Sequence, residues 1–364
     1  MKAFLILEDG TVYEGIGFGA QKEVVSEIVF NTSMTGYLEI LTDPSYAGQA
    51  VVMTYPLIGN YGVNASDMES LKVWPDALIV REISRMPSNF RSEAGIEEVL
   101  VKYNIPGIMG IDTRSLTKKL REIGTMNGMI TTNENYQLEE VISRIKEYRV
   151  TGVVEKVSRK TVEEYHPGDL GSEKVPVTKK VAVMDFGVKN NILRCLLNRG
   201  CEVKVYPAWT TANEIIADNP DGIMLTNGPG DPAECVGIIS EIKKLYDSGI
   251  PIFAICLGHQ LMALANGAKT HKMKYGHRGV NHPVKDLKSG KVYISSQNHG
   301  YVVTEGSIPA EVGEVGFINV NDGTVEGMRY KTGNVFTVQF HPEACGGPKD
   351  SDFLFDEFMK MMEV

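Results

Sequence analysis

A cysteine stands where an apolar run gives way to a helical pattern, in the stretch "PIFAICLGHQLMALANG" at residues 251–267. A nucleophile at a sharp turn between a strand and a helix is exposed above the sheet edge, and a small neighbour such as Gly258 allows the strained backbone. The amino end of the helix also favours thiolate over thiol, because its unpaired N–H groups attract negative charge. The pattern predicts that Cys256 is a nucleophile and that the N–H of Leu257 stabilises an oxyanion on an acyl group bound to the sulfur.

A base for this thiol occurs in "QFHPEA", residues 339–344. His341 follows a predicted strand, and Pro342 stiffens the segment that carries Glu343. An imidazole can take and return the proton of the thiol, and a carboxylate can fix the imidazole tautomer. Taken singly, each feature has a plainer interpretation, because most lone cysteines are structural and a His-Pro-Glu loop is usually a solvated turn. The hypothesis of nucleophilic catalysis rests on their combination.

Metal binding is the competing chemistry, because Cys256 and His259 lie three positions apart. Further histidines follow along the chain, namely His271, His277, His282 and His299. Their spacings match no tetrahedral zinc pattern and no acidic ligand cluster accompanies them, so we expect no metal site. A phosphate cradle is not expected either. The sequence has no GxxxxGK[ST] motif, and "GIGFGA" falls inside a predicted hairpin rather than at a strand-to-helix turn.

Alternating elements of the α/β type must position these residues in the second half of the chain. Short β-branched strands such as "KVAVMDFG" and "DGIMLTNGPG" alternate with amphipathic helices such as "VKNNILRCLLNRG" and "CVGIISEIKKLYDSG". This order predicts a mostly parallel sheet covered on both faces, with the site at the carboxyl ends of its strands. The turns after Phe186, Thr226 and Ile255 should therefore meet at one edge, where Gly228 and Gly230 offer further N–H groups. From about residue 269 the chain is expected to form shorter strands, among them "KVYISSQNHG" and "YVVTEG", and a final helix at "SDFLFDEFMKMMEV".

The first half is expected to be a mixed, β-rich α+β domain. The pattern predicts a hairpin at residues 2–19, whose turn is Asp9-Gly10. The stretch "DTRSLTKKLREIG" predicts a helix capped by Asp112 or Thr113 and ended by Gly124. A stretch rich in Pro, Gly and charge, "YHPGDLGSEKVPVTKK", marks the expected boundary. We therefore expect an N-terminal domain at 1–165, a linker at 166–179 and a second domain at 180–364.

Composition narrows the class of protein. The chain has 364 residues, 43% of them hydrophobic and 23% charged, which is typical of a globular protein of about two domains. A net charge of −9 provides no basic face for nucleic acid. Five scattered cysteines without a CxxC pair indicate reduced thiols. No apolar run is long enough for a membrane span and the first residues do not form a signal peptide, so we expect a cytoplasmic protein.

The motifs "NGPGDP", "AICLGHQ", "QNHG" and "QFHPEA", in this order, resemble the class I (triad) glutamine amidotransferase domain, which is flavodoxin-like. This resemblance implies that Cys256 is the nucleophile, His341 the acid and base, and Glu343 its orienting carboxylate, with an oxyanion hole from Leu257 and Gly228. The first half is similar to the small-subunit family of carbamoyl-phosphate synthetase, on the evidence of "VFNTSMTGYLEILTDPSYAGQ", "YPLIGNYGVN", "GIMGIDTRSLTKKLREIGTMNGMI" and "MDFGVKNNILR". In that family this domain has a swivelling-type fold and docks on the large subunit.

The resemblance also implies a set of residues that contact glutamine through backbone, hydroxyl and amide groups. The set is Ser45, Gly228, Gly230, Leu257, Gln260, Asn298, Gly300 and Tyr301. Two positions depart from the family pattern. Tyr301 replaces a common phenylalanine, and "CGGP" at 345–348 replaces Ser-Pro-Gly-Pro. Cys345 is then either an oxidation-sensitive neighbour of His341 or a small residue in a tight turn.

The activity implied is glutamine hydrolysis, with the ammonia passed to a separate large subunit that makes carbamoyl phosphate from ATP and bicarbonate for arginine and pyrimidine synthesis. No cofactor is expected in this chain, and ATP, Mg and bicarbonate belong to the large subunit, the partner in a heterodimer. Three alternatives remain open: a glutaminase component of anthranilate or guanylate synthesis, a cysteine hydrolase or peptidase sharing the nucleophile turn, and a non-catalytic scaffold. The extra N-terminal domain argues against the first, and the intact Cys256, His341 and Glu343 argue against the last.

Overall fold

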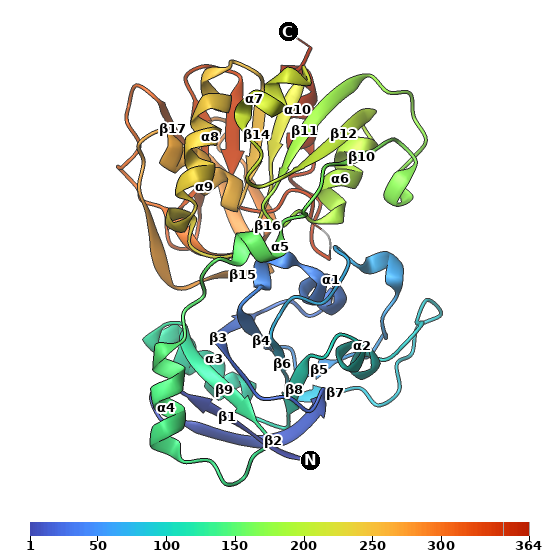
Figure 1. The fold of residues 1–364 in the computed structure, drawn as a ribbon, viewed down its shortest axis with the longest axis vertical. Helices are drawn as coiled ribbons and strands as arrows, with labels where there is room; N and C mark the ends of the chain where they lie inside the picture. Colours follow the sequence, from blue (N-terminus) through green and yellow to red (C-terminus); the bar gives the residue numbers. More distant parts are fainter. Residues whose placement is uncertain (345, 364) are drawn as a thin grey trace. The chain divides into compact units, whose positions relative to one another are not determined.

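A computed structural model describes residues 1–344 and 346–363, and the chain divides into two compact units at residues 151 and 152 (Figure 1). The expected linker at 166–179 lies within the second unit. Before it, β10 (Glu163–Tyr165) pairs antiparallel with β12 (Cys201–Pro207), and Val154 belongs to the core of the second unit. The Pro- and Gly-rich stretch therefore connects two elements of one unit.

The first unit is built on a closed barrel with strand order β1-β2-β8-β6-β4-β3-β9, and the small pair β5 and β7 lies outside it. The strands are β1 (Lys2–Leu7), β2 (Val12–Gly19), β3 (Val24–Asn31), β4 (Gln49–Met53), β5 (Leu57–Ile58), β6 (Ala77–Ile79), β7 (Glu82–Ile83), β8 (Pro106–Met109) and β9 (Met126–Thr131). The helices are α1 (Tyr37–Thr42), α2 (Ile96–Lys102), α3 (Thr113–Ile123), α4 (Leu138–Glu147) and the 3-10 helices η1 (Pro44–Tyr46) and η2 (Ala65–Asp67). The β-rich character predicted for this half is confirmed.

The hairpin and the capped helix predicted for this unit are both present. The expected hairpin forms from β1 and β2. In α3 the Asp112 side chain accepts a hydrogen bond from the N–H of Ser115 at 2.9 Å, and Gly124 ends the helix with φ +121°. Leu120 is buried, but Ile123, one turn later, is 60% exposed, so the packed face of the helix stops before its last turn.

The second unit contains a large mixed sheet in the order β10-β12-β11-β13-β14-β19-β18-β17-β15-β16. Its other strands are β11 (Lys179–Asp185), β13 (Gly222–Leu225), β14 (Ile252–Ile255), β15 (Thr270–Asp286), β16 (Val292–Val303), β17 (Gly313–Asn319), β18 (Val325–Tyr330) and β19 (Val335–Val338). Its helices are α5 (Val153–Val157), α6 (Asn190–Leu197), α7 (Ala212–Ala217), α8 (Val236–Asp247), α9 (Leu257–Ala265), α10 (Phe353–Met361) and the 3-10 helices η3 (Asp169–Gly171) and η4 (Pro232–Glu234). Strands β12, β11, β13, β14 and β19 are mutually parallel, which is the flavodoxin-like order expected from the sequence.

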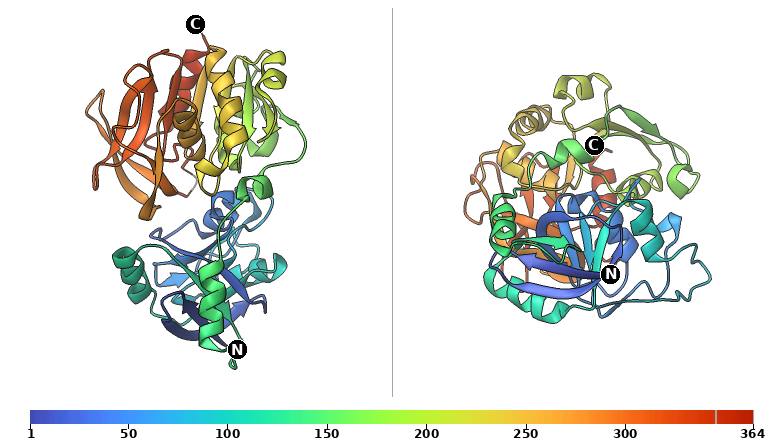
Figure 2. Two further views of the ribbon diagram at one scale, coloured as in Figure 1. Left: turned by 60° about the vertical axis from the view of Figure 1, so that its left-hand side comes forward. Right: turned by 60° about the horizontal axis from the view of Figure 1, so that its bottom comes forward.

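Alternation along β11 explains why helices cover both faces of this parallel region (Figures 1 and 2). Ala182 and Met184 pack in a cluster with side chains of α7, α8 and α9, whereas Val181 and Val183 pack in a second cluster with α6 and α10. Successive side chains of a strand point to opposite faces, so a strand buried on both sides reads as a continuous apolar run. The two segments expected as separate strands, "KVYISSQNHG" and "YVVTEG", form the single strand β16, because pairing with β15 continues on both sides of Gly300.

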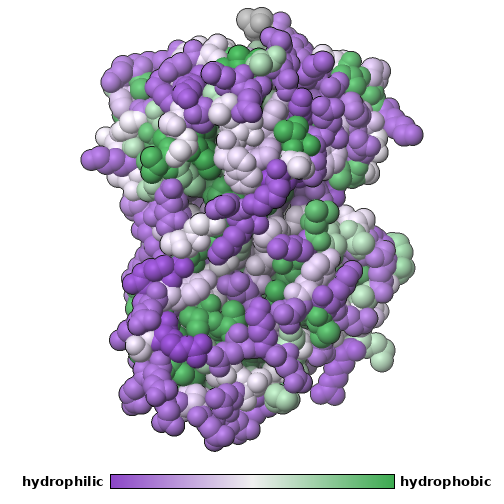
Figure 3. All heavy atoms as spheres, in the orientation of Figure 1, coloured by the Kyte–Doolittle hydropathy of each residue, from purple (hydrophilic) through white to green (hydrophobic). Residues whose placement is uncertain are grey.

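Polar residues cover most of the face drawn in Figure 3, with apolar side chains in scattered groups between them. Within residues 1–344 and 346–363, no helix combines the length and the apolar character that crossing a membrane would require.

Candidate functional site

The nucleophile turn joins β14 to α9 through Cys256, whose backbone has φ +53° and ψ −104°. This is a conformation that residues with a side chain rarely adopt, and such strain gathers at functional sites. The turn is held by hydrogen bonds from the N–H of Cys256 to the carbonyl of Val338 at 2.8 Å and from the N–H of Gly258 to that of Thr226 at 2.9 Å. A Cβ on Gly258 would lie 2.5 Å from the carbonyl oxygen of Leu225, so only glycine permits this close approach.

His341 and Glu343 follow β19, the parallel neighbour of β14. The N–H of His341 donates to the carbonyl of Ser296 at 2.9 Å, which fixes this loop against β16. Its ring Nδ1 lies 2.7 Å from Oε1 of Glu343, and both side chains are almost fully buried. Because a carboxylate can only accept, Nδ1 carries the proton and Nε2 is the nitrogen left for the thiol. Nε2 makes no hydrogen bond to any described residue, but Cys256 is close enough to raise the pKa of His341.

A buried lysine that the sequence did not single out completes this arrangement. Lys189 lies in the loop after β11, and its Nζ is 2.5 Å from Oε1 of Glu343. Burial raises the pKa of Glu343, but Lys189 and His341 outweigh it and lower that pKa to about 2. Burial and Lys189 lower the pKa of His341, but Glu343 and Cys256 raise it by a larger amount, so the pKa of His341 lies above its usual value. At neutral pH Glu343 is therefore a carboxylate and His341 favours the imidazolium form.

The three loops expected at one sheet edge do meet there. The Thr226 hydroxyl accepts from the N–H of Phe186 at 3.0 Å, and the Thr226 carbonyl accepts from the turn after Cys256. A Cβ on Gly228 would lie 2.3 Å from the carbonyl oxygen of Phe186, and Gly230 has φ +91°. Gly228 is thus required by the close packing of this loop against Phe186 and Leu257, the first residue of α9, and Gly230 by its left-handed backbone.

The other expected contact residues divide between the two units. Gln260, Asn298, Gly300 and Tyr301 belong to the second unit. There the Gln260 amide donates to the carbonyl of Tyr301 at 2.8 Å and to Oε1 of Gln339 at 2.9 Å, and the thiol of Cys256 donates to the carbonyl of Asn298 at 3.7 Å.

Ser45 belongs to the first unit. It lies in η1, where its N–H donates to Oδ1 of Asp43 at 2.9 Å. Cys345 falls outside the described residues.

His259, which shares the nucleophile turn, faces away from this chemistry. Its Nδ1 lies 2.7 Å from the Thr337 hydroxyl, and complete burial lowers its pKa to about 3. A buried neutral imidazole bonded to a hydroxyl is a structural element of the core.

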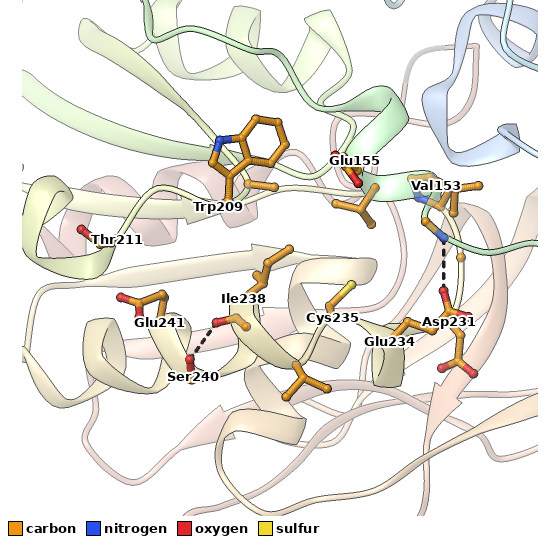
Figure 4. A pocket seen from close by; sticks show the side chains of 17 residues that line it. Val153, Glu155, Trp209, Thr211, Asp231, Glu234, Cys235, Ile238, Ser240 and Glu241 are labelled. Atoms are coloured by element: carbon orange, nitrogen blue, oxygen red, sulfur yellow. Dashed lines mark hydrogen bonds between the residues drawn. The ribbon is translucent and has the colours of Figure 1, made fainter.

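A separate cavity of about 590 Å³ opens in the second unit between α5, α8 and the loop after β12 (Figure 4). Trp209, Glu155 and Ile238 line it, and the N–H of Gly152 donates to Oε2 of Glu234 at 3.4 Å on its wall. Gly230 reaches this cavity, but Cys256, His341 and Glu343 do not line it.

The fold and this site together define a class I glutamine amidotransferase. The family model described as "Glutamine amidotransferase class-I" matches residues 182–361, and that described as "Carbamoyl-phosphate synthase small chain, CPSase domain" matches residues 5–130. The chain belongs to the family of carbamoyl phosphate synthase small chains. It is 52% identical to the carbamoyl phosphate synthase small chain of Clostridium perfringens over 99% of both chains, and 51% identical to that of Staphylococcus haemolyticus over 100% of this chain and 96% of the other. With that of Fusobacterium nucleatum the identity is 50%, over 99% of this chain and 98% of the other. The chain is accordingly a glutamine-hydrolysing subunit of carbamoyl phosphate synthase.

Proposed function

We propose that Cys256, His341 and Glu343 form the triad that hydrolyses glutamine. The thiolate attacks the side-chain amide carbon, and the oxyanion that forms is stabilised by the N–H groups of Leu257 and Gly228. His341 then gives its proton to the departing nitrogen, so that ammonia leaves and a thioester remains. The observation that carries this proposal is the strained turn at Cys256 beside a buried imidazole and carboxylate bonded at 2.7 Å.

Hydrolysis of the thioester uses the same groups in the opposite direction. Neutral His341 takes a proton from water, the resulting hydroxide attacks the thioester carbonyl, and the C–S bond breaks to release glutamate and the thiolate. Glu343 keeps Nδ1 protonated throughout, and Lys189 holds Glu343 in place. The net reaction is glutamine and water to glutamate and ammonia.

Glutamine is proposed to be held by Ser45, Gly228, Gly230, Leu257, Gln260, Asn298, Gly300 and Tyr301. The burial and ordered hydrogen bonding of Gln260 beside the Tyr301 carbonyl support a fixed pocket floor, since a pre-organised site loses less entropy on binding.

The ammonia is proposed to pass through an interior channel to a large subunit, which uses ATP, Mg and bicarbonate to make carbamoyl phosphate. Support comes from the relatives, whose names describe small chains, and from the sequence, which has no P-loop motif. The barrel unit is proposed as the docking surface in a heterodimer. The product would serve arginine and pyrimidine synthesis in the cytoplasm.

The test uses the chain together with its large subunit and compares glutamine with ammonium salt as the nitrogen donor. Cys256→Ser should abolish carbamoyl phosphate synthesis from glutamine and leave synthesis from ammonium unchanged. Cys235→Ser is the matched control, because Cys235 lies in the cavity of Figure 4 away from the triad, and it should retain both activities. Loss of both activities in Cys256→Ser, or of neither, would contradict the assignment of the nucleophile.

A further inference from the structure

Two histidines lie side by side in the folded chain, although the spacing of the histidines in the sequence suggested no metal site. His277 on β15 pairs directly with His299 on β16, and Glu326 on β18 lies beside them. One ligand atom from each of these three residues lies within 4.8 Å of the other two, and all three side chains are buried. With Gln297, which contacts both imidazoles, they form what we call the His277 cluster.

The outward-facing nitrogen of each imidazole is occupied by a group that can only accept a hydrogen bond. Nε2 of His277 lies 2.8 Å from Oδ2 of Asp322, and Nδ1 of His299 lies 2.8 Å from the carbonyl oxygen of Tyr301. These nitrogens must therefore carry protons. Imidazoles bind metal in the neutral form, in which the other nitrogen presents a lone pair, so in that form His277 Nδ1 and His299 Nε2 both direct lone pairs into the cluster.

Oxygen acceptors face these two ring nitrogens, and the amide nitrogen of Asn319 also lies 3.4 Å from His277 Nδ1. His277 Nδ1 lies 3.2 Å from Oε1 of Glu326 and 3.2 Å from Oε1 of Gln297, and His299 Nε2 lies 2.7 Å from the same Gln297 oxygen. Glu326 Oε1 receives one hydrogen bond, from Asn319 at 3.0 Å, while Oε2 has no hydrogen-bond partner among the described residues. Inverting the Gln297 amide would satisfy the ring nitrogens but still leave that carboxylate oxygen unpaired. Burial lowers the pKa of His277, but Asp322 and Glu326 outweigh it and raise that pKa to about 9, so a proton on His277 balances these electron pairs when no ion is bound. A metal ion would take the place of that proton.

We propose that the His277 cluster binds a divalent transition-metal ion, with Zn²⁺ as the best fit, through His277 Nδ1, His299 Nε2 and Glu326. Zinc prefers imidazole nitrogen and carboxylate oxygen at about 2.0–2.1 Å, which places neighbouring ligand atoms of a tetrahedron about 3.3 Å apart. The separation between His277 Nδ1 and Glu326 Oε1 is 3.2 Å. Gln297 or water would supply the fourth ligand.

The surroundings of the His277 cluster match those of known metal centres. Histidine ligands usually donate their second N–H to a carboxylate or a backbone carbonyl, which orients the ring and raises its basicity. Asp322 and the carbonyl of Tyr301 serve those roles. The negative charges of Glu326 and Asp322 together balance the charge of a divalent ion.

The position of the His277 cluster gives the ion a consequence for the glutaminase site. Gln297 and His299 flank Asn298 on β16, and the Asn298 carbonyl accepts from the thiol of Cys256. An ion bound to His299, the residue after Asn298, would fix the part of β16 that carries the Asn298 carbonyl. Metal binding should therefore rigidify this segment without supplying a group to the reaction.

The experiment uses the full chain, freed of metal with a chelator and titrated with Zn²⁺ or Co²⁺. We expect one equivalent of ion to bind, Co²⁺ to show the intense visible absorption of a tetrahedral site, and the thermal unfolding midpoint to rise on Zn²⁺ addition. Glu326→Gln and His277→Asn should each weaken Co²⁺ binding by at least about 10-fold. Two variants are used so that the test still holds if one of them fails to fold. Circular dichroism shows whether each variant is folded.

Controls separate the His277 cluster from adventitious binding. His271→Asn changes an exposed histidine on the same strand and should bind Co²⁺ like the unaltered chain. Cys256→Ser should also bind normally, and the Co²⁺ spectrum should lack a sulfur charge-transfer band. Equal affinity in all variants, a spectrum without tetrahedral character, or loss of binding in Cys256→Ser would each overturn the proposal.

Discussion

Replacing Lys189 with methionine tests the electrostatic account of the site, because it removes the cation from Glu343 and keeps most of the side-chain volume. The pKa of Glu343 falls from 4.5 to about 2 in the folded chain, which corresponds to roughly 3 kcal/mol at about 1.4 kcal/mol per pKa unit. Lys189 is the larger of the two cationic contributions and His341 remains in the variant. We expect Lys189→Met to lower the free energy of unfolding by about 2 kcal/mol at pH 7.

The pH dependence of this loss in unfolding free energy tests whether Glu343 is the group that Lys189 stabilises. A carboxyl whose folded pKa is depressed stabilises the protein above its unfolded pKa, and this contribution disappears as the pH falls through the folded pKa. The deficit of Lys189→Met should therefore be constant above about pH 5 and shrink as the pH falls below 4.5 towards 2. Urea unfolding at pH 7 and at pH 3.5 measures the difference. Because Trp74 and Trp209 lie in different units, a Trp74→Phe background lets Trp209 fluorescence report the second unit alone.

Lys244→Met is the matched control. Lys244 pairs with Glu241 at 2.6 Å on an exposed face of α8, and such surface pairs contribute roughly 0–1 kcal/mol. Lys189→Met should also reduce the rate of glutamine hydrolysis by roughly 10- to 100-fold, because Glu343 is less firmly held against His341. If Lys189→Met and Lys244→Met lose the same free energy at both pH values, the assignment of Lys189 as the counter-charge of Glu343 is refuted.

Three further outcomes follow from the geometry of the second unit. Gly258→Ala should cost several kcal/mol in thermal unfolding, since its Cβ would meet a strand carbonyl at 2.5 Å, whereas Gly237→Ala, in open space on α8, should be neutral or stabilising by up to about 1 kcal/mol. A histidine whose pKa is raised in the folded chain stabilises the protein at a pH below the unfolded pKa of 6.5, and this contribution is lost as the pH rises through about 9. The free energy of unfolding of His341→Asn should therefore fall less between pH 6.5 and 9 than that of the unaltered chain. Tyr301→Phe keeps the carbonyl that Gln260 uses, so its KM for glutamine should stay within about 3-fold of the original, and a larger rise would assign a role to the hydroxyl.

Features that depend on residues close together in the sequence could be predicted from the sequence. The run ending at Ile255 and the small residue at position 258 predicted a strand-to-helix turn, and β14, Cys256 and α9 form that turn with φ +53°. The alternation of apolar strands and amphipathic helices predicted the parallel sheet, because burial on both faces requires continuous apolar runs. The capped helix at Thr113–Ile123 followed from local hydrogen-bonding chemistry in the same way.

Features that depend on distant segments were decided by the tertiary structure. Lys189 reads as an ordinary loop lysine until parallel pairing brings the ends of β11 and β19 to one edge and places its Nζ beside Glu343. The Pro- and Gly-rich stretch that suggested a domain boundary near residue 166 indicates only local turns. The division after residue 151 depends instead on which segments pack into the same core.

The His277 cluster shows the same limit most clearly. Its residues have no motif spacing, because each comes from a different strand and strand pairing alone sets their separation. The sequence by itself therefore determined the strand-to-helix turn at Cys256 and the fold class, since both depend on short-range patterns of residue type. The tertiary structure decided the charges around Glu343 and the convergence of His277, His299 and Glu326, since contact between distant segments is fixed only by the packing of the whole sheet.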